Sequence, residues 1–407
     1  MLKDDEYKHL AGKFGTPLYV FDEREFLDNY YELLNTFRQI YPKYNISYSY
    51  KTNYTPYICS LIKAQGGYAE VVSDMEYALA LKLGYKNEHI VYNGPAKGPA
   101  LEEHIANGGI NNIDNPSEAF RICAFADSHP ELMIKTGLRI NIDLGRGFVS
   151  RFGLEPDSES MELVINELRK RKNIKISGIH CHLSHARDLE AWKKRTEIML
   201  NAADKYVDGV PEYISLGSGM FGRMEPSFEA QFGDNIPRYA DYAQVTMSEI
   251  AKHYEAVKPE EKPIVFTEPG ATLVSKYISF ISKVRDIKLL HGRTLAVTDG
   301  SFYNLGEVSL KKALPLMLIP DNDKAEEAES DIVGYTCLEY DCIYKNYKGP
   351  LDVGSLAVFG NAGGYSIVSK PQFIRPNCPM VAHRENGEDI EIMRAETFDD
   401  VFSKFRF

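Results

Sequence analysis

Short apolar runs alternate with longer amphipathic segments from about residue 17 to residue 270. The runs include ISYSY (46–50), YAEVV (68–72), KISGIHCHL (175–183) and KPIVFTEPG (262–270). Between them, apolar residues recur every three to four positions, which is the helical period. This alternation indicates βα units and a parallel sheet. Eight or so units over about 250 residues favour a closed (β/α)8 barrel over an open sheet.

The pattern changes after about residue 272. The stretches YISFISKVRDIKLL (277–290), LPLMLIP (314–320) and DIVGYTCLEYDCIY (331–344) indicate β-strands separated by turns. The acidic stretch at 321–330 predicts a solvated loop. We therefore expect an α/β protein with a (β/α)8 TIM barrel at 22–272. Residues 1–21 together with 273–407 are expected to form a C-terminal β-sheet domain.

Composition narrows the kinds of partner. A chain of 407 residues is too long for one ordinary core, and its net charge of −11 argues against nucleic acid and anionic membranes. No apolar run reaches the roughly 18 residues of a membrane span, and the first residues have no signal-like apolar core. The six cysteines are scattered without zinc-ligand spacing. We expect a cytoplasmic protein with reduced thiols and no metal site.

In a (β/α)8 barrel, the chemistry gathers where the strands end. Lys51 directly follows ISYSY, where partial burial would make a neutral amine available for a Schiff base; a purely structural lysine is the alternative. The glycine-rich LGSGMFG (216–222) follows another strand. Its backbone N–H groups suit a phosphate, although an ordinary tight turn uses the same residues.

Two further strand ends carry histidine and carboxylate. IHCHLSH (179–185) places His180 and His182 on one face of a strand, as a metal pair, as a ring-stacking histidine or as plain core residues. Glu268 precedes a Pro-Gly turn, where it suits a ring nitrogen, a metal or a turn cap. A lysine, a stacking histidine, a phosphate loop and a carboxylate together meet the needs of pyridoxal phosphate.

Several motifs occur in the order of a known family: YSYKTN, AEVVSDMEYALALKLG, IVYNGPAKG, GIHCHL, LGSGMFG, TEPG, CLEYD and GNAGGY. With them the chain resembles the fold-type III pyridoxal-phosphate decarboxylases, the diaminopimelate and ornithine decarboxylase family, over almost its whole length. The resemblance implies a PLP-dependent carboxy-lyase that releases CO₂ and an amine from an α-amino acid. It also implies a homodimer with shared active sites.

Roles follow from the motifs. Lys51 resembles the Schiff-base lysine, His182 the histidine that stacks on the cofactor ring, and Glu70 an acid near the cofactor. Glu268 resembles the partner of the pyridine nitrogen. The cofactor phosphate is assigned to Gly217, Ser218, Gly219 and Tyr365. The substrate is assigned to Arg151, Cys337, Asp341 and Phe373. Cys337 and Asp341 lie in the motif that a second subunit contributes, and Cys337 would return a proton to Cα.

The chain also departs from the family pattern. Ala271 stands where diaminopimelate decarboxylases have the arginine of E-P-G-R, and Leu338 stands where an acid follows the cysteine. Losing a bidentate arginine removes planar recognition of a carboxylate. We therefore expect an altered substrate, such as a conjugated or acyl-carrier-bound amino acid of a secondary-metabolite pathway. An amino-acid racemase or epimerase, which Glu268 disfavours, and a non-catalytic PLP-binding regulatory relative are the alternatives.

Overall fold

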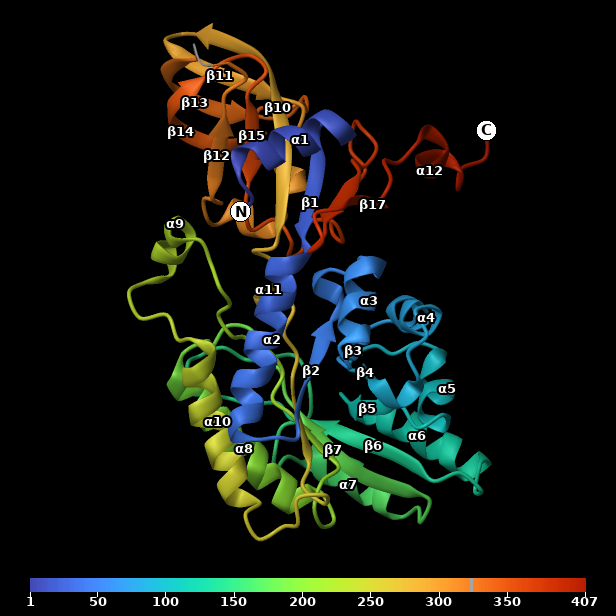
Figure 1. Cartoon of the computed structure of the whole chain (residues 1–407). Helices are drawn as coiled ribbons and strands as arrows, with labels where there is room; N and C mark the ends of the chain where they lie inside the picture. Colours follow the sequence, from blue (N-terminus) through green and yellow to red (C-terminus); the bar gives the residue numbers. More distant parts are fainter. Residues whose placement is uncertain (323–324) are drawn as a thin grey trace. The chain divides into compact units, whose positions relative to one another are not determined.

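The computed structural model describes residues 1–322 and 325–407, and these form two compact units (Figure 1). The barrel unit comprises residues 31–222 and 236–270. The β-rich unit comprises residues 1–30, 223–235 and 271–407. The domain boundaries at 22 and 272 stay a prediction, since compactness groups residues 23–30 and 223–235 with the β-rich unit. Within the described residues, no helix is both long and apolar enough to traverse a lipid bilayer.

The barrel unit confirms the predicted fold class. Eight parallel strands close into a barrel in chain order: β2 (Tyr44–Ser49), β3 (Tyr68–Val71), β4 (Ile90–Tyr92), β5 (Ile110–Ile113), β6 (Ile134–Arg139), β7 (Ile174–His180), β8 (Tyr213–Ser215) and β9 (Ile264–Thr267). The helices of this unit include α3 (Pro56–Ala64), α4 (Asp74–Lys82), α5 (Ala100–Ala106), α6 (Pro116–Ser128), α7 (Glu159–Arg169), α8 (Leu189–Tyr206) and α10 (Tyr239–His253). Helix α2 (Glu23–Ile40) begins in the β-rich unit and ends in the barrel unit.

Burial and capping explain these elements. Every residue of β3 is buried, as expected for a strand with both faces covered. In α7, Met161, Val164, Ile165 and Leu168 are buried at helical spacing, and the Ser158 side chain caps the first turn. One side-chain cluster, Tyr68, Val91, Tyr213 and Phe266, joins four different strands of the barrel. The regular spacing of apolar residues in the sequence therefore produces a buried core that joins these strands.

The β-rich unit contains a nine-stranded sheet. Its main path runs β14 (Cys342–Leu351), β13 (Glu326–Val333), β11 (Arg293–Thr298), β10 (Ile278–Leu290), β1 (Leu18–Asp22), β16 (Met380–His383) and β17 (Asp389–Met393), while β12 (Leu316–Ile319) and β15 (Leu356–Phe359) pair beside β10. Helix α1 (Asp4–Phe14) packs Tyr7 and Leu10 against this sheet. Short helices α9 (Pro226–Glu229), α11 (Ala271–Val274) and α12 (Phe398–Phe402) complete the unit.

Two local expectations were wrong. The acidic stretch at 321–330 was expected to be a loop, but β13 begins at Glu326 and pairs with β14, where Lys348 lies 3.3 Å from Glu329; positions 323–324 lie outside the described residues. Cys337 and Asp341 were expected in a β segment at 334–344, but residues 334–341, which include both, form a turn between β13 and β14. At 326–330 the pairing of β13 with β14, including the Glu329–Lys348 side chains, overrides the local sequence pattern. At 334–341 the buried carboxylate of Asp341 does so.

Candidate active site

Lys51 lies at the carboxyl end of β2, in a single 3₁₀ turn (Tyr50–Thr52). Its Nζ is 2.6 Å from Oε2 of Glu70 and donates to Oγ of Ser49, also at 2.6 Å. Glu70 is almost fully buried in β3, and Ser49 pairs with it in the β2–β3 register. The Lys51 side chain itself is 30% exposed. A lysine held by a buried carboxylate yet reachable from solvent is placed to react with a ligand.

Glu268 follows β9 and is 1% exposed. Its carboxylate accepts hydrogen bonds from Ser215 Oγ at 2.8 Å, Asn93 Nδ2 at 2.8 Å and His180 Nε2 at 3.0 Å. Burial alone would raise the pKa of Glu268, but His180 first and then His182 hold it well below its usual range. Glu268 is therefore a buried anion fixed in one orientation.

The two histidines differ in their surroundings. His180 is the last residue of β7 and is 1% exposed, with Nε2 on Glu268. His182 lies beyond the strand end, with its side chain 20% exposed and Nδ1 3.8 Å from the same carboxylate. Burial lowers the pKa of His182 to about 4, so its ring is neutral at neutral pH. A neutral, partly exposed ring suits stacking. In the described part of the chain, there is no group of three or more His, Cys, Asp or Glu side chains that could hold a metal ion.

A chain of hydrogen bonds sets the direction of Asn93. Burial holds the pKa of Tyr213 well above its usual range, so its hydroxyl stays a donor, here to Asn112 Oδ1 at 2.7 Å. Asn112 Nδ2 then donates to Asn93 Oδ1 at 2.7 Å. This leaves Asn93 Nδ2 to donate to both Glu268 and Glu70, the latter at 3.3 Å. The sequence analysis missed Asn93, although its position directly after the β4 run was the available signal.

The glycine loop after β8 approaches the β7 strand end closely. Gly217 and Gly219 have φ of +66° and +96°, and a Cβ on either would overlap a backbone carbonyl oxygen, that of Cys181 or Leu183. Both positions therefore require glycine. Glu268 N donates to Gly217 O at 2.8 Å, which ties this loop to the end of β9.

The remaining predicted residues lie on other segments of the chain. Arg151 is in the barrel unit, exposed, with its guanidinium 4.0 Å from the centre of the Phe152 ring. Tyr365, Cys337 and Phe373 belong to the β-rich unit. Tyr365 is 39% exposed with φ of +56°, and Cys337 is exposed. Their roles stay predictions.

Asp341 is buried within the β-rich unit. Its carboxylate accepts hydrogen bonds from Thr336 N and Oγ1, Ser301 Oγ and Phe302 N, at 2.6–3.1 Å. These contacts hold the turn at 334–341 and so position Cys337 on it. The predicted substrate contact of Asp341 stays a prediction, and its carboxylate already has four donors.

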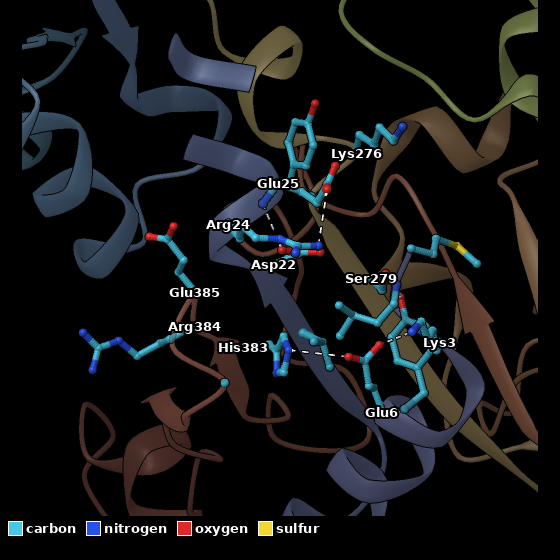
Figure 2. A pocket seen from close by; sticks show the side chains of 16 residues that line it. Lys3, Glu6, Asp22, Arg24, Glu25, Lys276, Ser279, His383, Arg384 and Glu385 are labelled. Atoms are coloured by element: carbon cyan, nitrogen blue, oxygen red, sulfur yellow. Dashed lines mark hydrogen bonds and ion pairs between the residues drawn. The ribbon is translucent and has the colours of Figure 1, made fainter. Parts of the chain in front are cut away.

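A polar cavity of about 390 Å³ lies in the β-rich unit (Figure 2). Charges of both signs line it; the Arg24 guanidinium lies 3.6 Å from the Glu25 carboxylate, and the backbone N–H of Lys3 donates to the carboxylate of Glu6. His383 also lies 3.9 Å from Glu6. None of the predicted site residues lines this cavity.

The barrel group fits the cofactor that the sequence implied. Lys51 supplies an amine for the aldehyde, and Glu268 supplies a fixed anion for the ring nitrogen. The Gly217–Gly219 loop forms a cradle that any side chain would fill. Glu268, after β9, and the glycine loop, after β8, lie on adjoining strand ends, as a ligand with a cationic ring and an anionic phosphate requires.

Curated relatives align over nearly the whole chain. A diaminopimelate decarboxylase of Methanothermobacter thermautotrophicus is 25% identical over 410 residues, covering 96% of this chain and 92% of that protein. An L-glutamyl-[BtrI acyl-carrier protein] decarboxylase of Niallia circulans is 25% identical over 427 residues, covering 98% and 96%. These matches are decarboxylases, and nothing in them supports the racemase or the non-catalytic alternative.

A solved diaminopimelate decarboxylase from M. jannaschii shares the fold, with a TM-score of 0.83 at 24% identity, covering 98% of this chain and 94% of that one. Residues 27–275 match the family model described as pyridoxal-dependent decarboxylase, pyridoxal binding domain. The chain therefore belongs to the pyridoxal-dependent decarboxylases, and it is an amino-acid carboxy-lyase that uses pyridoxal phosphate.

Proposed function

We propose that Lys51 is the residue that holds the cofactor, through a bond between its Nζ and the aldehyde carbon. The observation that carries this proposal is the 2.6 Å contact between Lys51 and buried Glu70, at the same barrel end as the Glu268 anion. Bound pyridoxal phosphate supplies an electron sink for the bond that breaks. Glu268 keeps a proton on the ring nitrogen, and the neutral ring of His182 packs on the cofactor face.

We propose an α-amino acid with a modified or carrier-linked side chain as the substrate. Ala271 and Leu338 place no charge where diaminopimelate recognition needs one, so a free distal carboxylate or amine has no fixed partner there. The relative from Niallia circulans acts on a glutamyl group on an acyl-carrier protein, by its name. A conjugated substrate of a secondary-metabolite pathway fits both facts.

The first test is direct. Borohydride treatment of the protein with pyridoxal phosphate should fix the cofactor to one peptide, which mass spectrometry should place at Lys51 and which Lys51→Ala should lose. The same preparation then meets a panel containing meso-diaminopimelate, lysine, ornithine and a glutamyl thioester of a carrier mimic. We expect CO₂ release with the thioester above the free diamino acids. Exchange of the α-proton without CO₂ release on every compound would overturn the decarboxylation chemistry at this site.

We also propose a cytoplasmic homodimer in which Cys337 of one subunit serves the barrel of the other. The supporting facts are the exposure of Cys337 on its turn and the six free thiols. Lys51→Ala and Cys337→Ala subunits, each inactive alone, should regain up to about a quarter of the wild-type activity when mixed and allowed to exchange, because one site of each mixed dimer is intact. No regain of activity in verified mixed dimers would count against shared sites.

A further inference from the structure

Arg195 is a buried cation without a carboxylate partner. It lies on α8, is 0% exposed, and is stacked 4.2 Å from the centre of the Trp192 ring. Its two terminal nitrogens donate to four backbone carbonyls at 2.7–3.4 Å, those of Leu183, Ala186, Leu216 and Ser218. Among the described residues, no acidic side chain lies within 4 Å of its nitrogens, Asp188 acts on its charge only from farther away, and Nε has no acceptor. Burying such a charge is costly unless an anion is nearby.

The contacts of Arg195 fix which way the glycine loop faces. Arg195 binds the carbonyls of Leu216 and Ser218, and Trp192 Nε1 donates to Gly219 O at 3.1 Å. In a trans peptide the N–H points opposite to the C=O. The loop therefore turns the carbonyls of Leu216, Ser218 and Gly219 toward α8 and the N–H of Gly219 away from it, while the carbonyl of Gly217 accepts from Glu268 N. In the part of the chain that the structure describes, the N–H groups of Ser218 and Gly219 donate to no protein acceptor.

The charge of Arg195 and the free N–H groups of the glycine loop act together. Free N–H groups in a glycine loop bind anions, and a cation behind the peptide plane polarises them further. The buried charge of Arg195 also lacks an opposite charge that a dianion in this loop would supply. The same guanidinium holds the carbonyls of Leu183 and Ala186, so it joins the loop to the segment that follows His182.

We propose that Arg195 is the buried counter-ion and positioning residue of the cofactor phosphate, acting through the peptide groups of residues 216–219. The proposal rests on the proposed function, because it takes the glycine loop as the phosphate site. Arg195 touches no ligand itself. It provides a positive charge from behind the loop.

The test compares pyridoxal phosphate with pyridoxal, which lacks the phosphate. Dissociation constants for both are measured by equilibrium dialysis for the wild type, Arg195→Met, Arg195→Lys and the control Lys193→Met, an exposed cation on the same helix. We expect Arg195→Met to lose at least about tenfold of the preference for the phosphate form, because a charge-assisted contact is removed. Arg195→Lys should keep part of that preference and Lys193→Met all of it.

Equally weaker binding of both ligands to Arg195→Met would mean that Arg195 only supports the fold. Unchanged binding of both ligands would mean that its charge does not contribute. Either result overturns the proposal. Failure of the wild type to bind pyridoxal phosphate at Lys51 would instead refute the proposed function. If Arg195→Met does not fold, ³¹P NMR of the wild-type complex decides. The bound phosphate should stay dianionic through the region of about pH 6 where it titrates in water. Titration at the solution value would overturn the proposal.

Discussion

Asn93→Leu tests the hydrogen-bond chain that orients the two active-site carboxylates. Asn93 is 2% exposed, and its amide nitrogen serves Glu268 and Glu70 while its oxygen accepts from Asn112. Leucine keeps the branching and the number of heavy atoms of asparagine but donates and accepts nothing. In the absence of cofactor, we expect the variant to be less stable to unfolding than the wild type. We also expect it to lose most of its decarboxylase activity.

The size of the stability loss follows from the three contacts. The 2.8 Å bond to Glu268 has a charged, buried acceptor and contributes about 1.5–3 kcal/mol. The 3.3 Å bond to Glu70 is longer and contributes about 0.5 kcal/mol. Asn112 Nδ2 is left without its acceptor in a buried site, which costs about 1–3 kcal/mol. The free energy of unfolding should therefore fall by about 3–6 kcal/mol.

Urea unfolding followed by tryptophan fluorescence measures this loss, because the chain has one tryptophan, Trp192, buried in the barrel unit. The matched control is Asn107→Leu, which removes an exposed amide whose nitrogen donates to Glu103 O at 2.8 Å. That control should cost under about 1 kcal/mol. A loss for Asn93→Leu as small as that of the control would refute the view that Asn93 organises the two carboxylates.

Three further changes test other parts of the barrel. Burial raises the pKa of Glu76 from its ordinary 4.5 to about 7. The protonated form therefore stabilises the fold fully below pH 4.5, and this stabilisation is lost as pH rises through 7. Glu76→Gln should raise the free energy of unfolding at pH 8 by up to about 3 kcal/mol and leave it unchanged near pH 4. Lys97 Nζ lies 2.7 Å from the carboxylate of buried Glu118, so Lys97→Met should lower the free energy of unfolding by about 3–5 kcal/mol. The double variant Lys97→Met with Glu118→Leu should recover much of this stability in thermal unfolding. A double variant no more stable than the single one would contradict a mutual pair. Gly217→Ala should lower cofactor retention on dialysis at least about tenfold, because its φ is +66° and a Cβ would overlap Cys181 O; full retention would show that the loop does not hold the phosphate.

Sequence pattern alone was enough for the barrel, and it placed Lys51 and Glu70 among the strand-end residues without pairing them. Neighbouring parallel strands bring such ends together, here in the register Ser49↔Glu70. The motif order added the family, and the family model and the relatives support it. Local periodicity failed at residues 334–341, where buried Asp341 gathers four donors into a turn that no strand pattern reveals.

The contacts around Glu268 were beyond the reach of the sequence. His180 and His182 differ by two positions, so strand alternation puts both on one face and cannot say which one meets the carboxylate. The structure separates them, because β7 ends at His180. Asn93 lies 175 positions before Glu268 and carries no motif of its own. Such partners are set by how the strand ends meet in three dimensions.

The charges of this barrel end explain why one cofactor satisfies it. Lys51 and Glu70 form a close pair, whereas Glu268 has no lysine or arginine within salt-bridge distance among the described residues, and Arg195 has no acid. Two buried charges of opposite sign thus lie on one ligand-binding end without a permanent counter-ion of full charge. In the arrangement proposed above, the protonated ring nitrogen of pyridoxal phosphate faces Glu268 and its phosphate binds the loop that Arg195 supports. On that proposal one rigid molecule pairs both charges at once, and neither a neutral ring nor a simple anion does so.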